Sequence, residues 1–258
     1  MPTDALVARL RAAGCVFAED EARLLRDATT SPDELEAMVR RRVDGEPLEI
    51  VLGWAEFCGL RIEMAPGVFV PRQRSEFLVG TAVELARPGA VVVDLCCGSG
   101  ALGAALAALA GPVELHAADV DPAAVRCARR NVEGAVYEGD LFDALPATLR
   151  GRIDVLLANV PYVPTGEIEL MPPEARLHEA RVALDGGADG LDVLRRVAAA
   201  APRWLAPGGH LLSETSSHQA PAAVAAFTAA ELDARVATDP DRGATVIVGT
   251  NPGARRNR

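Results

Sequence analysis

Residues 90–103, AVVVDLCCGSGALG, decide the fold class of this chain. The run AVVVDL is continuously apolar up to its aspartate, which predicts a strand buried on both faces. Gly98, Gly100 and Gly103 follow with the G-x-G-x-x-G spacing, which lets a strand turn tightly into a helix and lets a ligand approach the backbone. The segment therefore predicts a strand, a ligand-binding loop and a helix in immediate succession.

The chain around this segment alternates strand and helix. Further strands are expected at 113–120, 135–140, 153–159 and 209–214, with helical patterns between them. The last two strands, 233–239 and 244–249, are separated only by the turn PDRG, so they should run antiparallel. We therefore predict an α/β fold with a doubly wound, mostly parallel, seven-stranded Rossmann-like sheet and an antiparallel last strand.

The N-terminal part has a different pattern. Residues 1–45 predict a small helical domain for substrate recognition, in which Ser31 caps a helix that has Pro32 at its first position. Residues 46–75 alternate apolar and polar positions between glycines, which predicts a β-hairpin linker. Residues 76–258 then form the main domain.

The composition excludes several functions. The formal net charge of −10 repels duplex DNA, and a strongly basic cluster occurs only at Arg255, Arg256 and Arg258. All 26 basic residues are arginines, which excludes Schiff bases, pyridoxal chemistry and the P-loop. The five cysteines lack zinc-type spacing, so we expect no metal site and a reduced, cytoplasmic environment. We also expect no membrane association and a monomer.

Ligands of such sheets bind beyond the carboxyl ends of the strands. Asp119 ends the second strand about 20 residues after the glycines, where a carboxylate can bind ribose hydroxyls. A nucleotide-like cofactor is therefore predicted; the alternative is that the glycines only form a tight turn. Asp94, which three residues separate from Gly98, makes the loop resemble the first motif of S-adenosylmethionine-dependent methyltransferases. That resemblance assigns the cofactor to Asp94, Cys96, Cys97, Gly98, Ser99, Gly100, Asp119, Asp140, Leu141 and Asn159.

In that class the glycine loop approaches the amino-acid part of the cofactor. The resemblance gives Asp119 the ribose, and Asp140 with Leu141 the adenine. Cys96 and Cys97 are expected to be small packing residues of the loop rather than reactive thiols.

The fourth strand ends in the signature, Asn159-Val160-Pro161-Tyr162. It resembles the Asn/Asp-Pro-Pro-Tyr signature of enzymes that methylate planar nitrogens in glutamine, adenine or cytosine. Such a nitrogen is a weak nucleophile because its lone pair is delocalised, so it must be oriented toward the methyl group. The Asn159 side-chain oxygen and the Val160 carbonyl would accept its two N–H groups, and Tyr162 would pack on its plane. The alternative is a strand-ending turn.

Two longer segments extend the resemblance, PLEIVLGWAEFCGLRIEMAPGVFVPR (47–72) and HEARVALDGGADGLDVLRRV (178–197). Both are similar to segments of the HemK/PrmC family of release-factor glutamine methyltransferases. The family implies S-adenosylmethionine-dependent N5-methylation of glutamine, typically in the Gly-Gly-Gln loop of a peptide-chain release factor. The glutamates that follow the signature are expected to solvate a mobile lid: Glu167, Glu169, Glu174 and Glu179.

Several positions depart from the family pattern. Cys96 and Cys97 stand where the family has Gly-Thr, QRSE (73–76) replaces Pro-Glu-Thr-Glu, and SET (213–215) replaces Glu-x-Gly. Val160 replaces the first signature proline, which restores φ freedom at a cost of about 0.4–1 kcal/mol. Pro161 still confines residue 160 to extended conformations, and the carbonyl is kept. These departures suggest a divergent paralogue.

Three other functions stay open at this point. An N-methyltransferase of a nucleotide base or a small-molecule amide would keep the cofactor and Asn159 but change the acceptor. An NAD-dependent dehydrogenase is suggested by the literal glycine spacing. A non-catalytic binding module could retain the fold alone.

Overall fold

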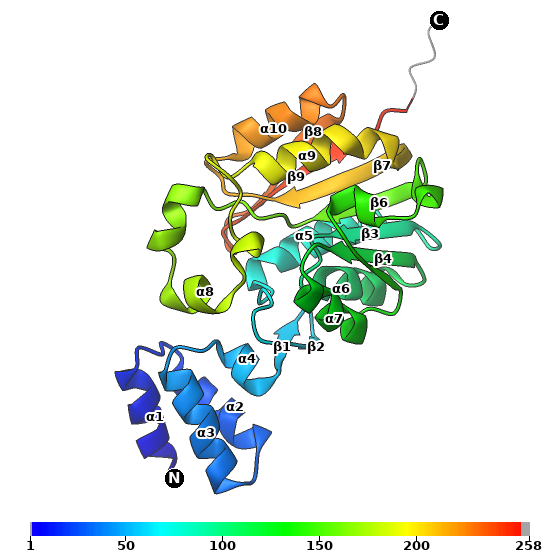
Figure 1. Ribbon diagram of the computed structural model, residues 1–258. Helices are drawn as coiled ribbons and strands as arrows, with labels where there is room; N and C mark the ends of the chain where they lie inside the picture. Colours follow the sequence, from blue (N-terminus) through cyan, green and yellow to red (C-terminus); the bar gives the residue numbers. More distant parts are fainter. Residues whose placement is uncertain (1, 254–258) are drawn as a thin grey trace, which may run out of the picture.

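The computed structural model describes residues 2–253, so the arginine cluster at 255–258 lies outside the described residues. A seven-stranded sheet has the order β5-β4-β3-β6-β7-β9-β8 (Figure 1). Its strands are β3 Val91–Leu95, β4 Glu114–Asp119, β5 Ala135–Glu138, β6 Ile153–Ala158, β7 Leu205–Glu214, β8 Asp233–Asp239 and β9 Ala244–Thr250.

The strand directions confirm the predicted mixed sheet. β3 pairs in parallel with β4 and β6, β4 with β5, and β6 with β7. β9 pairs antiparallel with both β7 and β8, so the last strand of the chain lies inside the sheet and β8 forms its edge. The carboxyl ends of the five parallel strands therefore meet at one edge, as the sequence pattern predicts.

Helices cover both faces of the sheet (Figure 1). One face packs on α5 Glu76–Val83, α6 Ala101–Ala110 and α7 Pro122–Asn131, and the other packs on α9 Asp192–Ala200 and α10 Ala220–Ala229. The loops hold α8 Pro173–His178 and 3-10 turns at Gln73–Ser75, Leu141–Ala144, Ala147–Leu149, Thr165–Leu170, Arg181–Ala183 and Ala201–Arg203. Each face thus has its own apolar core.

The N-terminal helices form a third core. They are α1 Thr3–Ala12, α2 Ala18–Ala28, α3 Pro32–Val43 and α4 Leu48–Leu52. Ser31 accepts a hydrogen bond from the Glu34 N–H at the start of α3, as its capping role predicts. α4 was not expected: Val51 is buried in this helical core and Gly53 ends the helix at φ +79°. The expected hairpin is therefore shorter and follows α4.

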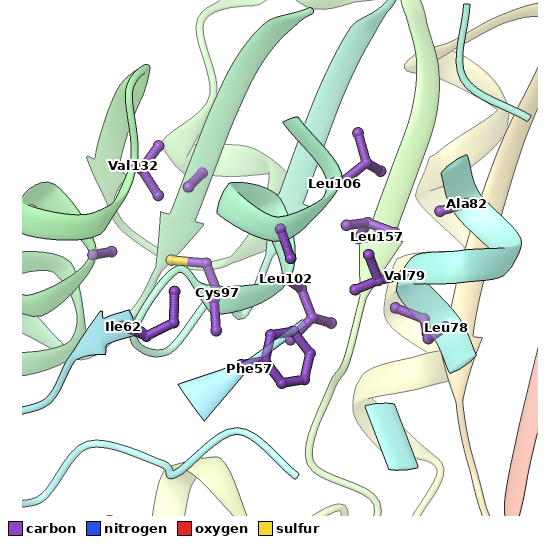
Figure 2. Packing of buried hydrophobic residues seen from close by; sticks show 14 of the residues in the cluster. Phe57, Ile62, Leu78, Val79, Ala82, Cys97, Leu102, Leu106, Val132 and Leu157 are labelled. Carbon is purple, nitrogen blue, oxygen red and sulfur yellow. The ribbon is translucent and has the colours of Figure 1, made fainter. Parts of the chain in front are cut away.

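The hairpin consists of β1 Trp54–Phe57 and β2 Leu60–Glu63. Figure 2 shows Phe57 and Ile62 pointing into the same core as Cys97 and Leu102 beside the glycine loop. Phe57 is fully buried there. The linker thus packs directly under the loop that begins α6.

One arginine connects the N-terminal helices with the loop that contains α8. The Arg42 guanidinium in α3 lies 2.6 Å from Glu21 in α2 and 3.3 Å from Glu174 in α8. Its side chain is 11% exposed, so solvent screens the pair with Glu21 only weakly. Figure 1 shows the loop with α8 next to the N-terminal helices.

Gly100 is expected to tolerate no side chain. It has φ +79°, and an added Cβ would lie 2.6 Å from Val132 Cγ2 and 3.2 Å from Ala128 Cβ. Gly100→Ala should therefore lower the free energy of unfolding by about 2–4 kcal/mol in urea denaturation, from backbone strain and overpacking together.

Gly89 provides the matched control for this substitution. It also has φ +79°, but an added Cβ there would point into open space, with no neighbouring atom within 4 Å. Gly89→Ala should cost only the backbone strain, about 1 kcal/mol. Equal losses in the two variants would contradict the packing argument.

Candidate active site

A cleft lies at the carboxyl ends of β3, β4 and β6, and it brings most of the predicted site residues together. The predicted residues that line the cleft are Asp94, Cys96, Cys97, Gly98, Ser99, Asp119, Asn159, Val160, Pro161 and Tyr162. Residues of the linker and of the loop after the signature complete the lining. Three predicted cofactor residues, Gly100, Asp140 and Leu141, are not among the described residues that line this cleft.

The glycine loop is held by the two predicted carboxylates. Asp119 Oδ2 accepts a hydrogen bond from the Gly98 N–H at 2.9 Å, and its Oδ1 accepts one from the Asp121 N–H at 2.9 Å. Asp94 Oδ2 accepts one from the Gly103 N–H at 2.9 Å, at the start of α6. Asp94 therefore fixes the turn from β3 into α6, while Asp119 remains at the cleft surface, where burial raises its pKa.

The three residues outside the cleft lining have other contacts. Gly100 packs against α7, as described above. Asp140 lies 2.6 Å from Arg196 of α9, and both side chains are about half exposed. Leu141 has φ +50° and packs against the core under α9. Their cofactor roles stay predictions from the resemblance.

The paired cysteines are packing residues in the structure. Cys97 is 5% exposed and belongs to the core on the α6 side of the sheet, whereas Cys96 packs toward the opposite core. Burial raises the pKa of both thiols above the usual value, so neither is a thiolate at neutral pH. This agrees with the expected packing role.

Asp94 should make folding stability depend on pH. Its side chain is buried, and burial raises the pKa of its carboxyl from 3.8 to about 7. The folded protein then binds a proton that the unfolded chain has lost between about pH 4 and 7, so this group's contribution to stability falls as pH rises through that window.

Asp94→Asn removes this titration and keeps an oxygen acceptor for the Gly103 N–H. The free energy of unfolding of the variant, relative to wild type, should rise by about 4 kcal/mol from pH 4 to pH 8. Urea denaturation at both pH values measures this difference. A difference that does not change with pH would contradict the assignment of the shift to Asp94.

Asn159 is the most unusual residue of the cleft. Its Oδ1 is buried and accepts no hydrogen bond from any described residue. A buried polar atom without a partner costs about 1–3 kcal/mol, so it is typically kept where a ligand supplies the partner. Val160, the next residue, is 2% exposed and packs into the core under α9. This packing holds residue 160 in place although it is not the proline of the family pattern.

Tyr162 is held by residues that the sequence did not single out. Its Oη donates to Glu214 Oε1 at 2.9 Å and accepts from Arg74 Nη2 at 2.5 Å. Glu214 also accepts from Ser75 Oγ at 2.6 Å and from Arg74 Nε at 2.9 Å. Burial, and then the Glu214 carboxylate, raises the pKa of Tyr162 to about 12. The phenol is therefore protonated at neutral pH and orients the ring rather than acting as a base.

Glu214 ends β7, so the rule that strand ends carry function could have found it. Arg74 and Ser75 lie in the QRSE segment, where the sequence noted only a departure from the family. No pattern in the sequence links them to Tyr162.

The loop after the signature packs back on it. Val163 exchanges backbone hydrogen bonds with Leu184 and Gly186, and an added Cβ on Gly186 would lie 2.7 Å from the Pro161 carbonyl. Glu179 was expected to solvate a mobile lid, and this expectation is wrong. Its side chain is buried, with 7% of the residue exposed, and its carboxylate binds Arg72 at 2.7 Å. Arg72 supplies the opposite charge that makes this burial possible.

Comparison with known proteins supports the methyltransferase resemblance of the residues that line the cleft. A family model described as the methyltransferase small domain matches residues 59–189. A release factor glutamine methyltransferase from Geobacter sulfurreducens is 39% identical over 86% of this chain and 80% of its own length. The chain belongs to the release factor glutamine methyltransferase family. This membership confirms the resemblance found in the sequence and makes the chain a methyltransferase.

Other similar proteins show the range of this group. The 4-amino-L-phenylalanine/4-methylamino-L-phenylalanine methyltransferase of Streptomyces pristinaespiralis is 39% identical over 74% of this chain and 68% of its own length. A solved methyltransferase structure from Pyrococcus furiosus superposes with a TM-score of 0.57 at 18% identity, covering 75% of this chain and 89% of that one, which supports the fold alone. Because the chain belongs to the release factor glutamine methyltransferase family, the alternative of an NAD-dependent dehydrogenase has no support.

No helix described between residues 2 and 253 has the length and apolar composition to cross a membrane.

Proposed function

We propose that this chain transfers the methyl group of S-adenosylmethionine to the N5 atom of a glutamine side chain in a peptide-chain release factor. The observation that carries the proposal is the buried Asn159 Oδ1, which belongs to a residue that lines the cleft and has no donor among the described residues. A glutamine NH₂ supplies that donor. The 39% identity to a protein named release factor glutamine methyltransferase supports the choice of acceptor.

The cleft residues fit the proposed cofactor. The Asp119 carboxylate, which accepts from the Gly98 N–H, lines the cleft and can also accept hydrogen bonds from ribose hydroxyls. Gly98 and Ser99 line the same cleft, where the amino-acid part of the cofactor is expected. Phe69 and Leu102 add apolar surface to the same cleft. When bound, S-adenosylmethionine supplies a sulfonium methyl group, whose C–S bond breaks as the N–C bond forms, and the methylated nitrogen then releases a proton to water.

The residues of the chain orient the acceptor. Asn159 Oδ1 and the Val160 carbonyl accept the two N–H groups of the acceptor amide, so its nitrogen faces the cofactor side of the cleft. The Tyr162 ring, held by Arg74 and Glu214, packs on the amide plane. No residue needs to remove a proton before the transfer, and the raised pKa of Tyr162 agrees with this.

The proposal is tested by incubating the protein with S-adenosylmethionine carrying a labelled methyl group and a purified full-length release factor. Mass spectrometry should locate one methyl group on the glutamine of its Gly-Gly-Gln loop. A release factor with that glutamine changed to alanine is the control and should take up no label. Equal labelling of the two release factors, or none of either, would disprove the proposal.

A second candidate is N-methylation of a small aromatic amine. It is favoured by the 39% identity to the 4-amino-L-phenylalanine/4-methylamino-L-phenylalanine methyltransferase, because an aniline nitrogen is also planar and weakly nucleophilic. Label transfer to 4-amino-L-phenylalanine but not to the release factor would select it. The sequence's expectations of a cytoplasmic monomer without nucleic-acid partners stay predictions.

A further inference from the structure

Gln219, just before α10, has hydrogen-bond partners for both ends of its side-chain carboxamide. Its Nε2 donates to the Tyr162 carbonyl and to the Asp189 carbonyl, each at 2.9 Å. Its Oε1 accepts from Ser216 Oγ at 2.8 Å. The residue is 9% exposed, so water replaces these partners poorly.

These bonds connect three loops. Gln219 belongs to the loop between β7 and α10, Tyr162 to the signature, and Asp189 to the glycine-rich segment 186–190. The packing at the junction leaves no space: an added Cβ on Gly190 would lie 2.3 Å from Gln219 Nε2 and 2.3 Å from the Tyr162 carbonyl oxygen. The Gln219 carboxamide therefore fills the junction of the three loops, and Gly190 has no room for a side chain there.

Tyr162 is consequently held at both ends. Its Oη is bound by Glu214 and Arg74, and its carbonyl by Gln219. Asn159 and Val160 lie immediately before it in a chain that Pro161 stiffens. The direction of the two acceptor oxygens thus depends on where the Tyr162 carbonyl is fixed.

We infer that Gln219 is a positioning residue for methyl transfer, which acts by fixing the signature backbone through the Tyr162 carbonyl. The inference rests on the proposed function for its reaction. Gln219 contacts the acceptor only through the signature, and it is not among the described residues that line the cleft. Its loss should therefore affect turnover and not cofactor affinity.

Two substitutions of similar length remove the donors. Gln219→Met has no polar group, and Gln219→Glu keeps the oxygen that accepts from Ser216 but cannot donate to two carbonyls when ionised. Both should lower kcat for methylation of a full-length release factor by about 100-fold, because misplacement of a reacting group by about 1 Å has that effect. The dissociation constant for S-adenosylmethionine, measured by calorimetry, should stay within about twofold of wild type.

Asn251 provides a matched control. Its Nδ2 also donates to two carbonyls, those of Leu205 and Ala206, at the opposite end of β7. Asn251→Leu removes an equivalent pair of hydrogen bonds without touching the signature, so kcat should be unchanged. A similar loss of kcat in this control would show that any weakening of β7 has the same effect, and would overturn the inference.

Amide hydrogen exchange separates this inference from the proposed function, since it needs no acceptor. Both Gln219 variants should exchange faster than wild type across residues 160–165 and 186–190, whereas Asn251→Leu should not. Unchanged exchange in the Gln219 variants, or wild-type kcat in either of them, would overturn the positioning role. Wild-type protein that leaves the release factor unmethylated would instead refute the proposed function.

Discussion

Asn159→Ala is expected to lower kcat/KM for the release factor by about 10²–10³-fold, the usual loss when one oriented hydrogen-bonding group is removed from an active site. The acceptor nitrogen loses the oxygen that directs it, while the cofactor side of the cleft keeps Asp119 and the glycine loop. Methyl transfer in a radiolabel assay measures the loss. The dissociation constant for S-adenosylmethionine should change far less than kcat/KM, because Asn159 is only one of the residues predicted to hold the cofactor.

The same substitution should not destabilise the protein. Asn159 Oδ1 is a buried acceptor without a partner among the described residues, so its removal relieves a desolvation cost. We expect the free energy of unfolding to stay equal or to rise by up to about 1 kcal/mol. Loss of activity together with a large loss of stability would indicate that Asn159 is a structural residue. Unchanged activity would favour a non-catalytic module.

Asp119→Ala is expected to weaken S-adenosylmethionine binding by about 100-fold or more, because hydrogen bonds to a charged acceptor contribute about 1.5–3 kcal/mol each. Beyond the ribose contact predicted for it, Asp119 also holds the Gly98 and Asp121 N–H groups. Isothermal titration calorimetry measures the change.

Asp121→Ala is the comparison for this variant. Asp121 also lines the cleft, but its side chain caps α7 by accepting from the Ala123 N–H. Its removal should cost helix stability of about 1 kcal/mol and change cofactor affinity much less. If the two variants weakened binding equally, the role given to Asp119 would be wrong.

The sheet could be predicted from the sequence because its signals are local. Apolar runs such as 91–95 and the glycine spacing after them fix strand, turn and helix within a few residues. α4 escaped prediction because its five residues are too few to show a helical period, and its helix depends on Val51 packing into the N-terminal core.

Some residues in and around the cleft could be predicted from the sequence, and others could not. Asp119 and Asn159 could be found because Asp119 ends β4 and Asn159 directly follows β6, where the fold gathers functional groups. Arg74 and Gln219 could not, since each contacts the signature from more than fifty residues away in sequence. The expectation for Glu179 was wrong because its partner, Arg72, lies 107 residues earlier in the sequence. A charge pattern alone does not show which carboxylate is paired.

The position of β9 has a consequence for shortened forms of the protein. β7, which carries Glu214 at its end, is flanked on one side by β9, the last strand among residues 2–253. A chain that lacks β9 therefore leaves this edge of β7 open to pairing with another chain. An early stop codon within 244–250 should therefore yield an aggregation-prone product, even though every described residue that lines the cleft precedes the stop.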